Sequence, residues 1–217
     1  MKNYRAFFLD FDGTLVDSEG SLFEAYCRLL SSFSKEPSRK EFESYIGPSI
    51  YEISGLIKKK HKIDQELDQI YKKYLYFVEK SYDSVSLMPG VEGVFSFAKS
   101  NSIKLYVVSS APLLIVKRVL ERFNIAGRFE NFFTCESVGK MKPDPSIYRY
   151  ALEATKFLGG EVLCFEDSVA GVESALGAGL EVVSINNTFP EDKKLIQYSS
   201  LQEFVEQNFA KAFSEEK

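Results

Sequence analysis

The segment that decides the fold is Phe8-Leu9-Asp10-Phe11-Asp12-Gly13-Thr14, in which a short apolar run meets two acidic residues and a glycine. The run itself, Ala6–Leu9, is apolar throughout and short, as expected of a buried β-strand. Similar runs rich in Val, Phe, Leu or Ile recur at Leu105–Val108, Phe132–Thr134, Val162–Phe165 and Val182–Ile185. The sequence therefore predicts a sheet of buried strands, with acidic residues directly after the first one.

Helical patterns separate the later strands, at Leu113–Phe123, Ile147–Phe157 and Val169–Leu176. Pro112 is expected at the first position of the first helix, and Ser168 at the N-cap of the third. Gly159-Gly160 and Gly177 are expected at the C-terminal caps of the second and third helices. Strands that alternate with helices of this length predict the α/β class, with a parallel sheet covered by helices on both faces.

The stretch from about Gly20 to Ser84 interrupts this alternation and contains no convincing strand. Its apolar residues recur at helical spacing among lysines and glutamates, for example at Leu22, Tyr26 and Leu29 and again at Ile70, Tyr74 and Phe77. We expect four helices inserted after the first strand, with Met88-Pro89-Gly90 returning the chain to the sheet. The predicted organisation is a core of residues 1–16 and 87–217 and a helical insertion of residues 17–86.

The composition is ordinary for a soluble globular protein of 217 residues, with 45% hydrophobic and 27% charged residues. A net charge of −4 gives no global attraction for nucleic acid or for an anionic membrane. Acids interrupt the first apolar run, so a signal peptide is not expected, and no apolar stretch approaches the length of a membrane span. We therefore expect a cytoplasmic protein, either a monomer or a dimer.

The cysteines and the histidine indicate no zinc site. Cys27, Cys135 and Cys164 form no CxxC pair, and we interpret them as small buried hydrophobic residues in a reducing compartment. His61 is the single histidine and lies in the run Lys58–Lys62. We interpret it as part of a solvated helix end or loop rather than as a catalytic base.

Polar residues follow the ends of three predicted strands: Asp10 and Asp12 the first, Ser109 and Ser110 the second, and Glu166 and Asp167 the fourth. In a parallel sheet the carboxyl ends of the strands carry the site, so we expect these residues to converge there, with Lys142 joining them from a loop. Carboxylates so close together repel each other strongly. A hard divalent cation with oxygen ligands, Mg²⁺, would relieve that repulsion.

Such a cluster has the parts that cleavage of a phosphate ester requires. A carboxylate attacks phosphorus to form an aspartyl-phosphate, while the cation and a lysine neutralise charge on the transferring oxygens. Serine hydroxyls and backbone N–H groups hold the remaining oxygens, which makes Ser109 and Ser110 phosphate-binding candidates. A second carboxylic acid protonates the leaving oxygen. Each residue alone has a simple structural explanation, such as a turn, an N-cap or a surface charge, but their joint occurrence favours the site.

Four segments resemble the motifs of the haloacid dehalogenase-like hydrolases: Asp10–Ser18, Val107–Ser110, Lys142–Pro145 and Phe165–Gly171. The resemblance implies a Rossmann-like core with an α-helical cap inserted after the first motif, which would make residues 17–86 the cap. The first motif is highly specific, and the four together extend over nearly the whole chain.

The resemblance also implies roles for the site residues. Asp10 would be the nucleophile and Asp12 the general acid and base, while Ser109 and Lys142 would contact the phosphoryl group. Mg²⁺ would be bound by Asp10, by the backbone carbonyl of Asp12 and by Asp167. Glu166 would bind the metal or act through water. Lys142 is chosen over Lys140 because a proline follows it directly, as in the family motif.

The acid at position 12 favours phosphate-ester cleavage over two other reactions that the resemblance would allow. Dehalogenases lack an acid there, since a halide leaves without a proton, and the phosphonate-cleaving relatives usually lack it too. We therefore expect a Mg²⁺-dependent phosphatase that acts on a small phosphorylated metabolite.

The substrate is expected to be selected by the cap, at Ile46-Gly47-Pro48. This loop resembles that of phosphoglycolate phosphatase-like proteins, with Ser49 in place of their second proline; a plain turn is the alternative. A β-phosphoglucomutase-like mutase is also possible, because the Glu166–Gly171 motif is common in that branch, although residues 45–57 contain no arginine or lysine for a second phosphate. A catalytically silent binding protein would lack one of the acids or the lysine, and none is missing.

Overall fold

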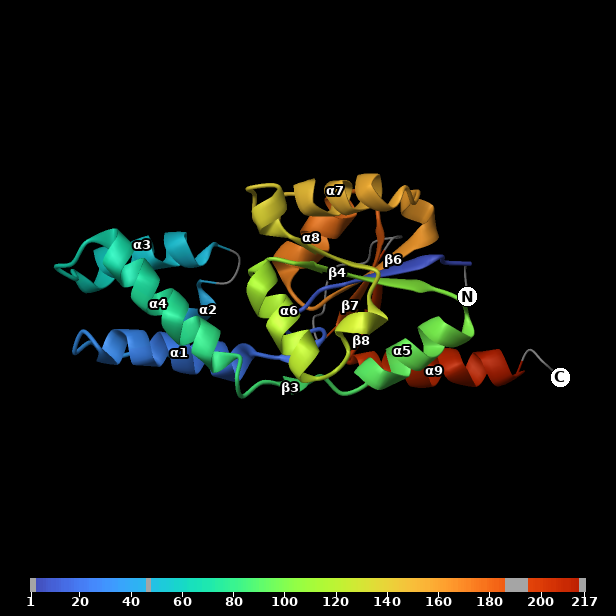
Figure 1. The fold of residues 1–217 in the computed structure, drawn as a ribbon, viewed down its shortest axis with the longest axis horizontal. Coiled ribbons are helices and arrows are strands. Elements are labelled where there is room, and N and C mark those ends of the chain that lie inside the picture. The colour runs from blue at the N-terminus through green and yellow to red at the C-terminus, as the bar shows by residue number, and fades with distance from the viewer. Residues whose placement is uncertain (1–2, 46–47, 186–194, 215–217) are drawn as a thin grey trace. The chain divides into compact units, whose positions relative to one another are not determined.

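The computed structural model describes residues 3–45, 48–185 and 195–214, with side chains described up to residue 208 (Figure 1). The chain divides into two compact units, which we describe separately. The first consists of Met1–Asp17 and Leu87–Lys217, and the second of Ser18–Ser86. The assignment of the second unit as a cap over a catalytic core remains a prediction.

The first unit is built on a parallel sheet. Within the described residues it has six strands in the order β5-β4-β1-β6-β7-β8, all pairs parallel. The strands are β1 (Ala6–Leu9), β4 (Lys104–Ser109), β5 (Asn131–Thr134), β6 (Val162–Glu166), β7 (Glu181–Ile185) and β8 (Leu195–Tyr198). The predicted parallel α/β sheet is therefore confirmed. Its edge strand β8, whose residues are half-buried or exposed, was not predicted.

Helices cover both faces of this sheet, as predicted. They are α5 (Val91–Ser100), α6 (Leu113–Arg122), α7 (Ser146–Thr155), α8 (Val169–Gly177) and α9 (Leu201–Ser214), with short 3₁₀ turns η1 (Ala126–Arg128), η2 (Cys135–Ser137) and η3 (Gly159–Glu161). Phe8 packs in one cluster with residues of α7 and α8. Phe7 points the opposite way, as alternation along a strand requires, and its ring contacts those of Phe97 in α5 and Phe204 in α9.

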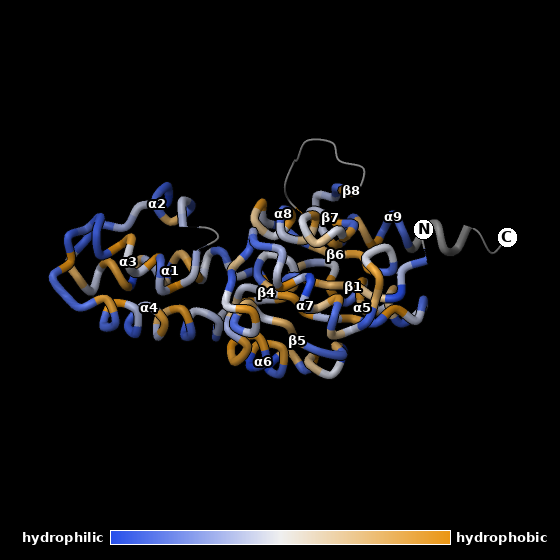
Figure 2. Tube along the Cα trace, turned by 90° about the horizontal axis from the view of Figure 1, so that it is seen from above, coloured by the Kyte–Doolittle hydropathy of each residue, from blue (hydrophilic) through white to orange (hydrophobic). Residues whose placement is uncertain are grey.

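Hydropathy along the chain explains these layers. Figure 2 shows hydrophobic residues gathered along the central strands, and β1 is fully buried over its whole length. Strands buried on both faces need apolar residues at every position rather than at alternate ones. This is why the short continuous apolar runs were sufficient to locate β1, β4, β6 and β7.

Three predicted helix boundaries are wrong. α7 ends at Thr155, with Lys156 in the left-handed conformation (φ 60°), and Gly159-Gly160 instead begin η3. α8 includes Gly177, and the left-handed residue beyond it is Gly179 (φ 87°). Pro112 is the N-cap of α6 rather than its first helical residue. The Ser168 cap is confirmed, because its hydroxyl accepts from the Gly171 N–H at 3.0 Å.

The second unit is helical, as the periodicity predicted. In its described part it contains four helices, α1 (Glu19–Ser31), α2 (Arg39–Glu43), α3 (Ile50–His61) and α4 (Leu67–Ser81). Tyr26, Ile57 and Tyr74 are buried among them, since the apolar stripe of each helix faces the others. The pair of two-residue strands β2 (Val16–Asp17) and β3 (Ser86–Leu87) lies at the two ends of this segment and was not expected.

His61 ends α3, as predicted, but its side chain is only 14% exposed, so the predicted solvated position is wrong. Its Nε2 lies 2.9 Å from Oε1 of Glu41, a buried carboxylate of α2 that also accepts from the Tyr45 hydroxyl at 2.6 Å. Burial alone would raise the pKa of Glu41, but hydrogen bonds from Tyr45, His61 and Lys60 lower it to about 2. The basic run that ends α3 therefore neutralises a buried acid.

Cys135 and Cys164 are buried, as expected, whereas Cys27 is only half-buried. Among the described residues, no helix has the length and apolar character needed to cross a lipid bilayer.

Candidate active site

The register of the sheet brings the predicted site residues to one edge. Leu9 of β1 pairs with Val107 of β4 on one side and with Phe165 of β6 on the other. Asp10 follows directly, and its N–H donates to the Phe165 carbonyl at 3.0 Å. The carboxyl ends of three neighbouring strands therefore meet where the sequence places acids and serines.

Lys142 connects these strand ends through three hydrogen bonds. Its ammonium donates to Asp10 Oδ1 at 2.7 Å and to Glu166 Oε1 at 2.6 Å, and also to the Val108 carbonyl at 2.9 Å. The side chain is 5% exposed and that of Glu166 is fully buried. An ammonium has three donors, so every one of them has a partner here.

Lys140, by contrast, lies outside this cluster. Its side chain is 60% exposed and pairs with Asp144 at 3.2 Å. Of the two lysines in the third motif, Lys142 is therefore the one among the acids.

The electrostatics of the cluster follow from burial and like charge. Burial would lower the pKa of Lys142, but the carboxylates of Asp10 and Glu166 outweigh it and raise that pKa, so the lysine stays charged. Burial, and then the charge of Asp10, raise the pKa of Glu166 against the opposing effect of Lys142. Burial and the charges of Asp10, Glu166 and Asp12 raise the pKa of Asp167. Negative charge at this edge therefore exceeds what the lysine neutralises.

A divalent cation fits this excess of carboxylates. Asp10, Glu166 and Asp167 each offer an oxygen, and these atoms all lie within 4.8 Å of one another. Glu166 Oε2 is buried and has no hydrogen-bond partner among the described residues, which is costly for a carboxylate oxygen in the absence of a cation. Oxygen ligands of this kind suit Mg²⁺.

Two glycines allow the acids to approach the backbone. A Cβ on Gly171 would lie 1.8 Å from Glu166 Oε2, and a Cβ on Gly13 would lie 1.9 Å from Asp167 Oδ2. Gly13 also has a φ of +71°, which favours glycine. Both glycines stand in the segments that resemble the family motifs, but sequence reasoning gave them no role.

The remaining core residues of the prediction lie at the same edge. Ser109 is buried, and its Oγ accepts from the Ala111 N–H at 2.9 Å; Ser110 Oγ lies 3.6 Å from Cys135 Sγ. Asp12 forms an isolated bridge with Val16. The phosphate-binding role of the serines and the acid–base role of Asp12 remain predictions.

The structure describes only part of the predicted substrate loop. Ile46 and Gly47 lie outside the described residues, while Pro48 is half-buried and precedes α3. Ser49 caps that helix: its Oγ accepts from the Glu52 N–H at 3.2 Å, and its own N–H donates to Glu52 Oε2 at 2.7 Å. Ser49 therefore has a structural role where the resemblance would place a second proline.

Tyr148 is a residue of this cluster that sequence reasoning did not single out. It is fully buried on α7, and its hydroxyl donates to Glu166 Oε1. In the sequence it is an ordinary apolar-face position six residues after Lys142, and nothing there signals a polar contact.

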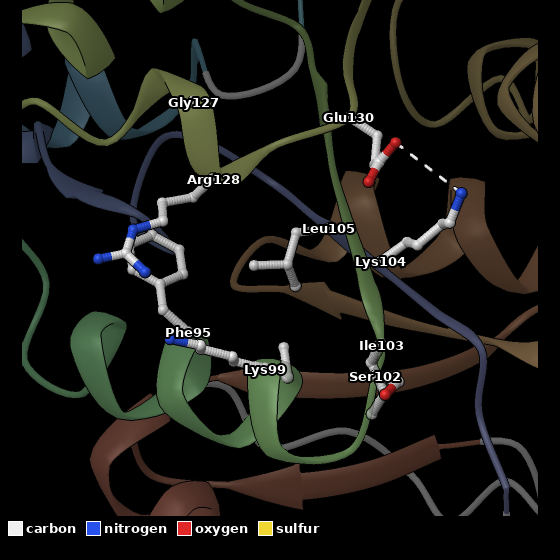
Figure 3. A pocket seen from close by; sticks show the side chains of 10 residues that line it. Phe95, Lys99, Ser102, Ile103, Lys104, Leu105, Gly127, Arg128 and Glu130 are labelled. Atoms are coloured by element: carbon white, nitrogen blue, oxygen red, sulfur yellow. Dashed lines mark ion pairs between the residues drawn. The ribbon is translucent and has the colours of Figure 1, made fainter.

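A hollow of about 360 Å³ lies away from these residues, beside α5 and η1 (Figure 3). Phe95 and Leu105 line it, Lys104 pairs with Glu130 across 3.9 Å at its rim, and the Arg128 guanidinium lies over the Phe95 ring. Lys104 begins β4 and Glu130 precedes β5, so the hollow lies at the amino ends of these strands. It is therefore separate from the acidic cluster at their carboxyl ends.

The chain belongs to the haloacid dehalogenase-like hydrolase family, because residues 7–185 match the model of that family. The parallel sheet and the acid–lysine cluster at its carboxyl edge agree with this assignment. It is similar to the phosphorylated carbohydrates phosphatase of Thermotoga maritima, with 31% identity over 88% of this chain and 90% of that protein. It is also similar to the 6-phosphogluconate phosphatase of Escherichia coli, with 28% identity over 84% and 82%.

A solved structure shares the fold. The β-phosphoglucomutase of Clostridium difficile superposes with a TM-score of 0.80 over 97% of this chain and 99% of that one, at 20% identity. At this identity the likeness establishes the Rossmann-like fold alone.

Proposed function

We propose that this chain is a Mg²⁺-dependent phosphatase that hydrolyses a phosphate monoester of a small metabolite through an aspartyl-phosphate on Asp10. The observation that carries the proposal is the buried triad in which the Lys142 ammonium donates to both Asp10 and Glu166. A carboxylate oxygen of Asp167 lies within 4.8 Å of oxygens of these two acids, so the three carboxylates could bind one divalent cation. The phosphatase names of both curated relatives support it.

The proposed reaction has two steps. In the first, a carboxylate oxygen of Asp10 attacks phosphorus and the P–O bond to the metabolite breaks, while Asp12 gives its proton to the departing oxygen. In the second, Asp12 takes a proton from water, whose oxygen attacks phosphorus and displaces the Asp10 carboxylate. The products are the dephosphorylated alcohol and inorganic phosphate, and both acids return to their initial states.

Lys142 has two tasks in this scheme. Its bond to Asp10 Oδ1 orients the nucleophile, and its charge offsets the negative charge that builds on the phosphoryl oxygens. Ser109, at the end of β4, would hold a phosphoryl oxygen. Asp10, Glu166 and Asp167 would hold Mg²⁺, together with the Asp12 carbonyl that the resemblance implies. The cation would supply further positive charge to the same phosphoryl oxygens.

Release of inorganic phosphate from para-nitrophenyl phosphate in the presence of Mg²⁺ tests the proposal. Asp10→Asn keeps the shape of the side chain but removes the nucleophilic oxygen anion, so activity should vanish. Undiminished activity in this variant would show that another residue attacks phosphorus.

Phosphorylated carbohydrates and sugar acids are the substrate class that we propose, because these are what the two relatives are named for. The helical unit Ser18–Ser86 would act as the cap that selects among them, through the predicted loop at Ile46-Gly47-Pro48. A panel of phosphorylated metabolites, compared by kcat/KM and including phosphoglycolate, tests this choice. Phosphoglycolate as the preferred substrate would overturn it.

The mutase alternative is tested with glucose 1-phosphate and a bisphosphate primer. A phosphatase releases inorganic phosphate, whereas a mutase converts the substrate to glucose 6-phosphate without releasing it. The absence of arginine and lysine from residues 45–57 favours the phosphatase.

A further inference from the structure

We propose that Tyr148 is a positioning residue that anchors one oxygen of Glu166, so that the other oxygen remains available to the cation. The inference rests on the metal site of the proposed function, and it adds to that site a residue which does not itself touch the metal or the substrate.

Tyr148 is a polar exception in an apolar layer. It lies on α7 among Phe8, Val108, Ile147 and Ala151, all buried in the same cluster. A phenylalanine would fill nearly the same volume there, whereas a buried hydroxyl is costly unless it is hydrogen-bonded. Its hydroxyl donates to Glu166 Oε1, and the ring lies 5.2 Å from Lys142 Nζ, so the side chain contacts both partners of the buried ion pair.

The two oxygens of Glu166 have different surroundings. Oε1 accepts from both Lys142 and Tyr148. Oε2 lies against Gly171, where even a Cβ would collide with it, and has no hydrogen-bond partner in the described part of the chain. Because a carboxylate is rigid and planar, two donors on Oε1 also fix the direction of Oε2.

Lys142 alone would hold Glu166 less well. Its ammonium is shared with Asp10 and with the Val108 carbonyl, so it follows the nucleophile as well as Glu166. Tyr148 bonds Glu166 from a helix packed on the sheet, and this bond is independent of Asp10. The tyrosine therefore keeps Glu166 in place when Asp10 changes its charge during the reaction.

Tyr106 provides a matched control for packing. It is a second buried tyrosine of the same cluster, on β4, and its ring lies against Phe8 (5.5 Å between centroids) and Phe157 (6.2 Å) rather than against the acids. Tyr106→Phe and Tyr148→Phe each remove one hydroxyl from a buried tyrosine of the same hydrophobic cluster. Only the second removes a donor to Glu166.

The experiment measures Mn²⁺ binding to the purified full chain by electron paramagnetic resonance, without substrate, together with the KM for para-nitrophenyl phosphate. Outer residues that orient a ligand typically change metal affinity by about 10- to 100-fold. We expect Tyr148→Phe to weaken Mn²⁺ binding by about 10-fold or more, while KM at saturating Mn²⁺ stays within about twofold of the parent value and Tyr106→Phe changes neither. In a Glu166→Gln background, Tyr148→Phe should have no further effect.

Equal Mn²⁺ affinity in Tyr148→Phe and the parent would overturn the proposal, as would an equal loss in Tyr106→Phe. If Glu166→Gln does not fold, the comparison of the two tyrosine variants still decides. A parent chain that binds Mn²⁺ in this Tyr148-dependent way but releases no phosphate from any substrate would contradict the proposed function and leave the positioning role standing.

Discussion

Replacing Lys142 by alanine removes the ammonium that Asp10 and Glu166 share. Glu166 is fully buried and Asp10 nearly so, and the two carboxylate oxygens bonded to Lys142 would lose their positively charged partner. Removing one partner of a buried ion pair typically costs about 3–5 kcal/mol, because the remaining charge stays desolvated and unpaired. We therefore predict that Lys142→Ala lowers the free energy of unfolding at pH 7 by about 3–5 kcal/mol in the absence of divalent cations.

Lys140→Ala is the matched control for this measurement. Lys140 lies two residues away, is 60% exposed, and pairs with Asp144, whose side chain is 36% exposed. Exposed pairs contribute about 0–1 kcal/mol, so the control should lie close to the parent.

Urea denaturation with and without Mg²⁺ measures both effects. A ligand that binds only the native state adds about 2.7 kcal/mol at a concentration of 100 Kd. Mg²⁺ should restore more stability to Lys142→Ala than to the parent, because the cation then takes over the neutralisation of two unpaired carboxylates. A loss below about 1 kcal/mol, or an equal response of parent and variant to Mg²⁺, would refute the reasoning that Lys142 holds these acids.

Three further predictions concern single residues. Gly171→Ala places a methyl group on Glu166 Oε2, so it should lower kcat/KM and weaken Mn²⁺ binding in calorimetry; unchanged binding would mean that this oxygen is not a ligand. Asp12→Asn should lower kcat by about 10²–10⁴-fold for an alkyl phosphate. The loss should be smaller for para-nitrophenyl phosphate, because its leaving group needs no proton. Equal losses of kcat for the two substrates in steady-state assays would count against Asp12 as the general acid. Glu41 has its pKa lowered to about 2, so its contribution to stability is complete above the unfolded value of about 4.3 and fades as pH falls toward 2. The Tm difference between the parent and Glu41→Gln should therefore be largest near pH 7 and shrink below pH ~4, and a constant difference would contradict the depressed pKa.

The sheet and the acidic edge were predictable because both follow from local patterns. β1 and β6 contain short continuous apolar runs, as expected for strands that are buried on both faces. Once these strands are parallel neighbours, Asp10 and Glu166 must meet at their carboxyl ends.

The features that were missed depend on contacts that no local pattern encodes. Tyr148 has the periodicity of a core residue, and its hydroxyl finds Glu166 only because α7 packs on that face of the sheet. β8 lies at the sheet edge, where its residues are half-buried or exposed, and it lacks a continuous apolar run. α7 ended before its expected glycines because Lys156 itself adopts the left-handed conformation, which is costly for a lysine and therefore not anticipated.

His61 shows the same limitation in the helical unit. A histidine among lysines suggests a solvated helix end, and only the packing of α2 against α3 places the buried Glu41 beside it. The role of the loop at Ile46-Gly47-Pro48 in substrate selection remains a prediction, because Ile46 and Gly47 lie outside the described residues.

The central claim, that Asp10 attacks phosphorus, is tested most directly by trapping the covalent intermediate. The enzyme is mixed with excess para-nitrophenyl phosphate and Mg²⁺, quenched in acid within a single turnover, and digested for mass spectrometry. We predict a phosphoryl group on the peptide that carries Asp10, located on that carboxylate by fragmentation and absent from Asp10→Asn. A phosphoryl group on any other residue, or turnover with no adduct on Asp10 at any quench time, would contradict the assignment.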